Sequence, residues 1–180
     1  MTTAVAISLR SLIAGLVLCC AATAALGQSG DKVDRIPIAN SDFPISAAVV
    51  VPSGYDTIYV SGNIPKVANP NAPKGSTEAY GDTKAQTISV LQQIEKTLAD
   101  QQLSMADVVM MHVFLVGDPA NGGKMDFAGM MTGYTQFFGT REQPNKPARS
   151  AVQVAGLAAP GALVEIEVIA VRRHAAQLVH

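Results

Sequence analysis

The chain has 180 residues, of which 48% are hydrophobic and 15% charged, so it can bury a sizeable core and does not have the composition of a disordered protein. Its formal net charge is −1, and its basic residues form no run longer than Arg172-Arg173. Nucleic-acid-binding proteins normally carry a basic surface, so we expect no nucleic-acid partner.

Residues 1–27 have the features of a secretory signal peptide. Arg10 supplies the positive charge, an apolar segment rich in alanine and leucine follows, and Ala25-Leu26-Gly27 has the small-x-small form of a cleavage site. The apolar segment is short for a membrane span and has no basic flank after it. We therefore expect a periplasmic or secreted protein that makes no membrane contact once the leader is removed. An uncleaved membrane anchor is the alternative.

The two cysteines, Cys19 and Cys20, both lie inside this leader. A chain that starts at Gln28 would therefore have no disulfide, no thiolate zinc site and no cysteine nucleophile. It would also lose Arg10 as its one charged residue, which leaves 12 Lys+Arg against 14 Asp+Glu and a net charge of −2. A cysteine-free chain is suited to an oxidising compartment.

The first part of the mature chain is predicted to be a flexible lead-in followed by a hairpin. Residues 28–42 are polar and irregular. Residues 46–52 and 57–61 are rich in β-forming side chains and are separated by a turn that contains Pro52 and Gly54, which predicts two paired strands. The SGNIP segment then ends the second strand, and its glycine, Gly62, permits close approach of the backbone.

Two helices and one central strand are predicted next. Residues 77–101 have apolar side chains at intervals of three and four, which indicates an amphipathic helix. Residues 108–116, VVMMHVFLV, predict a strand that is buried on both faces. Residues 125–138 predict a second helix, in which the methionines are interpreted as core residues.

The segment 147–173 predicts two further strands, residues 149–155 and 162–171, joined by a turn at Pro160-Gly161. Side chains alternate along a strand, so the polar members of each strand share a face. We interpret them as one polar face opposite a Val/Ile face that packs under the helices. The polar residues are Arg149, Gln153, Glu165 and Glu167, with Ala151 among them. A half-exposed, solvated sheet would give the same pattern.

The order ββ-α-β-α-ββ predicts an α+β fold, in which two helices cover one face of a single mixed sheet. We divide the chain into a signal peptide (1–27), a flexible lead-in (28–42), one domain (43–173) and a C-terminal tail (174–180).

Arg149 and Glu165 form the pair to which we assign chemistry. A guanidinium can bind a carboxylate through two parallel hydrogen bonds, and a carboxylate can position or activate a water molecule. The chain has no phosphate-binding glycine loop and no nucleophile elbow. Its three histidines, His112, His174 and His180, have no partners at ligand spacing, so no metal site is expected.

Four segments resemble the reactive-intermediate deaminase family, also called the YjgF-like or L-PSP endoribonuclease-like family. They are YVSGNIP, the VFL end of the central strand, DFAGMMTGYTQFF, and PARSAVQVAGL with VEIEVIAVRR. The resemblance covers residues 43–173, and its last segment is the most specific.

This resemblance implies a chorismate-mutase-like fold, a homotrimer with clefts between subunits, and the hydrolysis of 2-imino acids or enamines to 2-keto acids and ammonia without a cofactor. Arg149 matches the family arginine that binds the substrate carboxylate, and Glu165 the glutamate that holds the attacking water. The backbone of Ala151 and of the Gly62 turn is expected to line the site.

Two departures from the family pattern make the expected cleft more apolar. Ile45 stands where the active deaminases have a tyrosine, and Met131 where they have an asparagine; Ala151 replaces a cysteine that is not expected to be catalytic. These departures leave open a second hypothesis, a non-catalytic trimer that binds a small carboxylated metabolite through Arg149. Ribonuclease activity is a third hypothesis, against which the absence of a basic surface and of a histidine acid–base pair argues.

Overall fold

The computed structural model describes residues 31–174. The predicted signal peptide, residues 1–27, lies outside the described residues, so it stays a prediction, as does the tail beyond His174. In the part of the chain that the structure describes, no helix has the length and hydrophobicity needed to cross a lipid bilayer.

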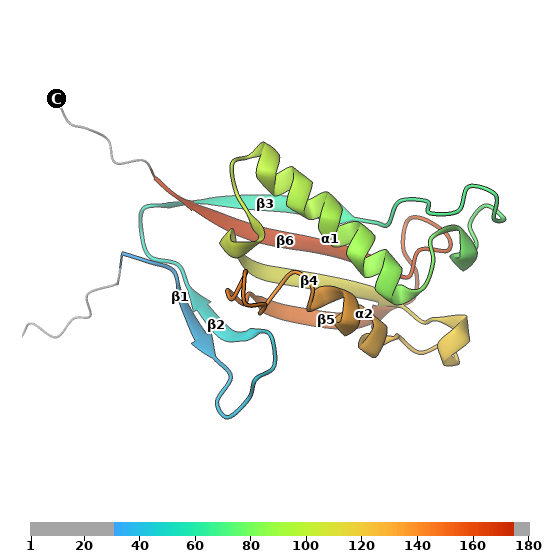
Figure 1. The fold of residues 1–180 in the computed structure, drawn as a ribbon, viewed down its shortest axis with the longest axis horizontal. Helices are drawn as coiled ribbons and strands as arrows, with labels where there is room; N and C mark the ends of the chain where they lie inside the picture. The colour runs from blue at the N-terminus through green and yellow to red at the C-terminus, as the bar shows by residue number, and fades with distance from the viewer. Residues whose placement is uncertain (1–30, 175–180) are drawn as a thin grey trace, which may run out of the picture. The chain divides into compact units, whose positions relative to one another are not determined.

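A four-stranded mixed sheet is the centre of the fold (Figure 1), with the spatial order β3-β6-β4-β5. β6 is antiparallel to both of its neighbours, whereas β4 and β5 are parallel. Because β5 comes last in this order, it is an edge strand. The strands are β3 (Tyr55–Asn63), β4 (Val108–Val116), β5 (Ala148–Val154) and β6 (Val164–Arg173).

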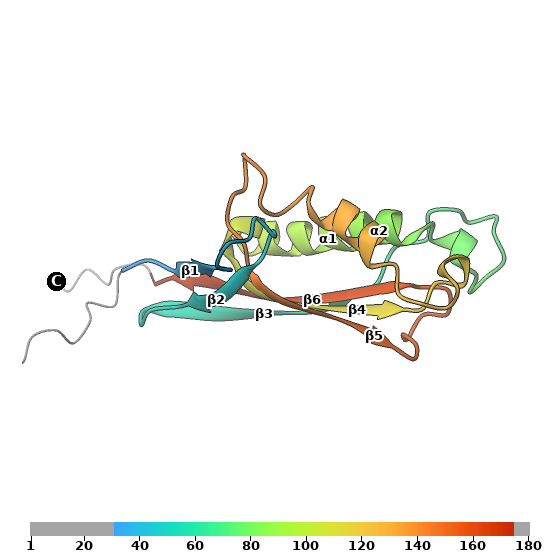
Figure 2. The same ribbon diagram turned by 90° about the horizontal axis from the view of Figure 1, so that it is seen from below.

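Two helices, α1 (Thr83–Asp100) and α2 (Phe127–Tyr134), lie on the same face of this sheet, as Figure 2 shows. Each helix begins at an aspartate whose carboxylate accepts a hydrogen bond from a backbone N–H of the first turn: Asp82 from Ala85 at 2.7 Å and Asp126 from Gly129 at 2.8 Å. The predicted α+β fold with both helices on one face is confirmed.

Both helices are shorter than predicted. The predicted helix over residues 77–101 is divided: Thr77–Ala79 form a separate 3₁₀ turn, and α1 starts only after Gly81, whose φ is +86°. A positive φ is incompatible with a right-handed helix, so the chain changes direction at this glycine. The predicted helix over residues 125–138 is regular only between Phe127 and Tyr134.

The core lies between the helices and the face of the sheet that they cover, here called the helix face. Its central side chains are at most 2% exposed: Met111, Val113, Leu115, Ile166 and Val168. Burial of each such side chain contributes about 1.5–3 kcal/mol to the stability of the fold.

The opposite side of the sheet, here called the open face, is covered by no helix within residues 31–174. Its members are Tyr59, His112, Phe114, Ser150, Val152, Glu165 and Glu167, which the strand register places on one side. The prediction that β4 is buried on both faces is therefore wrong, because alternate residues such as His112 and Phe114 are only half-buried.

The predicted hairpin between residues 46–52 and 57–61 is also wrong. β2 (Ser46–Val50) pairs with β1 (Asp34–Pro37) in a separate two-stranded antiparallel sheet, and β3 pairs with β6 instead. Turn residues such as Pro52 and Gly54 indicate that the chain changes direction, but they do not determine which strand it then joins. The longer partner, β6, lies distant in sequence.

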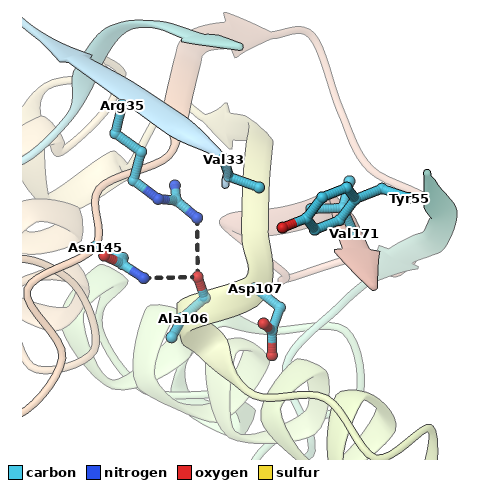
Figure 3. Close-up of a pocket in the computed structure, with 7 residues that line it drawn as sticks. All are labelled: Val33, Arg35, Tyr55, Ala106, Asp107, Asn145 and Val171. Atoms are coloured by element: carbon cyan, nitrogen blue, oxygen red, sulfur yellow. Dashed lines mark hydrogen bonds between the residues drawn. The ribbon is translucent and has the colours of Figure 1, made fainter. Parts of the chain in front are cut away.

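The strand β1 also corrects the prediction of a wholly irregular lead-in, and Arg35 holds this strand in place. Its guanidinium donates hydrogen bonds of 2.8 Å to the carbonyl oxygens of Lys146 and Ala106. Figure 3 shows Arg35 and Asn145 both directed at the Ala106 oxygen. The side chain of a residue early in the chain thus satisfies carbonyl groups beside the starts of β4 and β5.

The predicted polar face does not exist as one surface. β5 and β6 are not neighbours, because β4 lies between them. Arg149 is in register with Met111, and Met111 with Val168, so Arg149 is on the helix face. Glu165 is in register with Phe114 on the open face. Alternation in the sequence predicts which side chains of one strand share a face. It does not predict which face of β5 lies on the same side of the sheet as a given face of β6, because residues 155–163 connect strands that are not neighbours.

Candidate active site

Arg149 lies near the start of the edge strand β5, and three aromatic rings surround its guanidinium. The guanidinium carbon is 4.4 Å from the ring centre of Tyr134, 5.6 Å from that of Phe43 and 5.8 Å from that of Phe127. The rings of Phe43 and Phe127 are nearly parallel, with centres 6.5 Å apart. A cation is attracted to the face of an aromatic ring, so these contacts hold the guanidinium in one orientation.

The guanidinium also has an unused hydrogen-bond donor. Nη1 of Arg149 is buried and has no acceptor among the described residues. Burial lowers the pKa of Arg149, yet an arginine remains charged in proteins. A buried donor without a partner costs about 1–3 kcal/mol, and more when it is charged. The arrangement is therefore suited to an anion that accepts this hydrogen bond.

Tyr134 links the wall of this site to the segment between β1 and β2. Its hydroxyl donates a 2.8 Å hydrogen bond to the carbonyl oxygen of Pro44, which fixes the segment in which Phe43 contacts Arg149 and Ile45 packs against the core. Burial raises the pKa of Tyr134 above its ordinary range, so the hydroxyl stays a neutral donor.

Four of the predicted site residues are brought together on the helix face. Met131 lies on α2 one turn from both Phe127 and Tyr134, and Ala151 follows Arg149 on the same face of β5. Ile45 and Met131 are partly buried apolar side chains that pack against the core. We call Arg149 and its surroundings the Arg149 cluster: Phe43, Ile45, Phe127, Met131, Tyr134, Arg149 and Ala151.

The other two predicted site residues, Gly62 and Glu165, meet on the open face. β3 has a register shift between Val60 and Asn63, and Gly62 lies within it. A methyl group at this position would overlap the carboxylate of Glu165, so only glycine allows the carboxylate to lie against the backbone here.

Within one chain, the Arg149 cluster and the pair Glu165 and Gly62 do not come together. The Arg149 cluster is on the helix face at the edge strand, whereas Glu165 and Gly62 are on the open face between β6 and β3. The sheet itself separates them.

Prediction from sequence missed the aromatic rings around Arg149. Phe127 and Tyr134 are seven residues apart and so lie on one face of the helix predicted over residues 125–138, and this spacing is the signal that the sequence offers. No comparable signal in the sequence indicates that Phe43 would reach Arg149.

His112 and Glu167 form a second polar pair on the open face. Nδ1 of His112 is 2.9 Å from Oε1 of Glu167, and Ser150 is in register with His112 on the other side. Within residues 31–174, histidine and acidic side chains form no group of three or more that could hold a metal ion.

A cavity of about 230 Å³ next to β1 is a less suitable site (Figure 3). Its two charged side chains already have partners within the chain. Arg35 donates to two carbonyl oxygens, and Asp107 accepts from the backbone N–H and the hydroxyl of Ser104. We therefore assign this cavity a structural role.

Residues 44–172 match the family model described as Endoribonuclease L-PSP. The chain belongs to this family. The resemblance to the reactive-intermediate deaminases is thereby confirmed at the level of the family. The roles of Arg149, Glu165, Ala151, Gly62, Ile45 and Met131 remain predictions.

A member of the family with an assigned activity is similar to this chain. The 3-aminoacrylate deaminase RutC of Acinetobacter baylyi is 33% identical over 127 residues, which cover 71% of this chain and 88% of that protein.

Solved structures of the family share the fold. A Rid-family protein of unknown function, YyfB from Yersinia pestis, is 26% identical with a TM-score of 0.57, covering 77% of this chain and 97% of its own. TdcF from E. coli, solved with bound serine, is 31% identical with a TM-score of 0.50, covering 68% of this chain and 84% of its own.

Proposed function

We propose that the protein hydrolyses 2-imino acids or enamines to 2-keto acids and ammonia. The observation that carries this proposal is the buried Nη1 of Arg149, a fixed cationic donor that lacks an acceptor within residues 31–174. Two relatives support it. One is named a 3-aminoacrylate deaminase, whose substrate is an enamine with a carboxylate, and another was solved with serine, which also has a carboxylate.

In the proposed mechanism, Arg149 binds the carboxylate and so fixes the position of the neighbouring C=N carbon. An enamine first gains a proton on carbon from solvent and loses one from nitrogen to solvent, which gives the imine. Glu165 accepts a proton from a water molecule while the water oxygen forms a bond to the C=N carbon. Glu165 passes this proton to nitrogen, which gives a carbinolamine. It then transfers the hydroxyl proton of the carbinolamine to nitrogen as well, so the C=O bond forms while the C–N bond breaks and ammonia leaves. One imine and one water thus give one keto acid and one ammonia, and the residues of the chain suffice for each step.

We further propose that the site forms between subunits of a homotrimer, with Arg149 from one chain and Glu165 from the next. The two side chains occupy opposite faces of the sheet in one chain, so a second copy must supply one of them. Apolar side chains on the open face support this assembly, since Tyr59 is 76% and Val152 47% exposed.

The deaminase proposal is tested with imines generated in situ by an amino-acid oxidase. We expect the protein to accelerate hydrolysis of 2-iminobutyrate and 2-iminopropionate, and Arg149→Ala and Glu165→Gln to abolish the effect. Loss of the Arg149 charge should reduce kcat/KM at least about 30-fold, which corresponds to about 2 kcal/mol of lost binding. Arg141→Ala and Glu95→Gln, which change exposed residues of the same types, are the matched controls.

The non-catalytic hypothesis predicts a different result in the same experiment. If wild type gives no acceleration above buffer but still binds 2-ketobutyrate in an Arg149-dependent manner, the protein is a carboxylate-binding trimer. Binding that Arg149→Ala leaves unchanged would contradict both hypotheses.

We also propose that the protein acts outside the cytoplasm after its leader is removed. Cell fractionation followed by N-terminal sequencing should recover a chain that starts at Gln28 from the periplasm or the medium. Recovery of residues 1–27 in the membrane fraction would show an uncleaved anchor instead.

A further inference from the structure

We infer that the Arg149 cluster selects 2-imino and 2-keto acids whose side chains are large and apolar. The inference rests on the proposed function in one respect, the assignment of Arg149 as the carboxylate-binding group. It applies to binding as well as to turnover, so it can be tested whether or not the protein is a catalyst.

The surroundings of the guanidinium are made of carbon. Phe43 is 37% exposed and Phe127 is half-buried, and both rings contact the guanidinium of Arg149. Ile45 and Met131, on the adjoining segment and on α2, are half-buried as well. A carboxylate bound by the Arg149 guanidinium would bring the rest of a small acid against the rings that contact it, and its side chain would then replace water against them.

The hydroxyl groups of Tyr134 and of two threonines on α2 are already used within the chain. Tyr134 donates to the Pro44 oxygen at 2.8 Å. On α2, Thr132 donates to Ala128 at 2.9 Å and Thr135 to Met131 at 3.0 Å, both to backbone oxygens of their own helix. A polar substrate side chain would lose hydrogen bonds to water without gaining these groups as partners.

The size of the expected preference follows from the burial of apolar surface. Each additional buried methylene is worth about 0.8 kcal/mol, which is a three- to fourfold change in an equilibrium constant. The flexible thioether of Met131 can adapt to branched and aromatic groups, so the preference is expected to extend to both kinds.

The test measures binding of a series of stable 2-keto acids to the purified protein by calorimetry: pyruvate, 2-oxobutanoate, 4-methyl-2-oxopentanoate and phenylpyruvate. We expect affinity to rise along the series, by about three- to fourfold for each methylene that is added up to the leucine-derived acid. Turnover of the imines derived from alanine and leucine is measured in parallel.

Two substitutions test the assignment of the wall. Met131→Gln keeps the approximate shape of the side chain, and Ile45→Thr shortens it by one methyl group; both add polar atoms, so both should reduce the preference for 4-methyl-2-oxopentanoate over pyruvate. Thr132→Gln, an exposed change on the same helix, should leave the preference unchanged.

The outcomes separate this inference from the deaminase proposal. Equal or tighter binding of pyruvate, or a preference that persists in Met131→Gln and Ile45→Thr, overturns the inference. Binding that survives in Arg149→Ala also overturns it. An apolar preference without any imine turnover supports the inference and overturns the deaminase proposal alone.

Discussion

At the scale of single residues, Tyr134 connects the stability of the fold to the proposed site. Its ring is fully buried and lies against Arg149, while its hydroxyl holds the Pro44 carbonyl. The same side chain thus shapes the site, fixes the segment that contains Phe43 and Ile45, and keeps a neutral hydroxyl in the interior.

Removal of this hydroxyl should cost stability. Tyr134→Phe keeps the ring but leaves the Pro44 oxygen without its donor, so the free energy of unfolding should fall by about 1 kcal/mol. Urea unfolding measures the change. Tyr80→Phe is the control, since the hydroxyl of Tyr80 makes no hydrogen bond within residues 31–174. Equal stability of the two variants would contradict the role given to Tyr134.

The raised pKa of Tyr134 also predicts a loss of stability in alkali. In the unfolded chain a tyrosine loses its proton near pH 10, whereas burial raises the pKa of Tyr134 in the folded state. The stabilising contribution of the neutral hydroxyl is therefore complete below about pH 10 and is lost as the pH rises toward the folded-state value. Unfolding measured between pH 8 and 11 should show a steeper decline for wild type than for Tyr134→Phe, and parallel curves would refute the assignment.

Gly62 should be essential for activity although it has no side chain. In Gly62→Ala the new methyl group overlaps the Glu165 carboxylate, which must move. Displacement of a catalytic group by about 1 Å can cost on the order of 100-fold in rate, so we expect a loss of this order in kcat/KM. Gly156→Ala is the matched control, because a methyl group there meets nothing within 4 Å. Comparable activity in the two variants would exclude the proposed position of Glu165.

At the scale of elements, Arg35 accounts for the order of the β1–β2 sheet. Arg35→Ala removes two hydrogen bonds between a charged group and backbone oxygens, each worth about 1.5–3 kcal/mol. Backbone amides of β1 and β2 should then exchange with solvent at least tenfold faster by hydrogen–deuterium exchange, as a local loss of about 2 kcal/mol implies. Lys32→Ala, which changes an exposed residue nearby, should not alter the exchange of these amides. If Lys32→Ala accelerates their exchange as much as Arg35→Ala does, Arg35 is not the residue that anchors the sheet.

The patterns within each segment predicted the individual elements well, but not their partners. The apolar run of β4 and the apolar stripe of α1 are local features: β4 forms where it was predicted, and α1 forms within its predicted range but starts only at Thr83. The predicted hairpin, by contrast, required β3 to pair with β2, whereas β3 pairs with β6, which is distant in sequence. Tertiary packing determines which strands pair. In the candidate site, Arg149 and Glu165 lie on the two strands that were predicted, β5 and β6, yet β4 separates these strands and the two side chains occupy opposite faces. The pairing of the strands and their register across the sheet determine which side chains share a face, and the pattern within one strand predicts neither.

At the scale of the whole molecule, the division of the site between faces predicts complementation between inactive variants. Arg149→Ala and Glu165→Gln subunits are each expected to be inactive alone. When they are unfolded and refolded together in equal amounts, about one site in four should receive an intact Arg149 from one chain and an intact Glu165 from its neighbour in a cyclic trimer. Recovery of about a quarter of the wild-type activity would match this geometry.

Light scattering on each sample measures the assembly directly. Trimers that regain no activity on mixing would show that both groups act within one chain. A monomeric mass for the wild type would exclude the shared site altogether.

The opposite placement of Arg149 and Glu165 has a genetic consequence. In a ring of such chains, every copy contributes to two sites, so a copy that lacks both side chains disables two sites instead of one. Expressed in equal amount beside the normal gene product, it would leave about a quarter of the activity rather than half. A defective allele would therefore be partly dominant over the normal one.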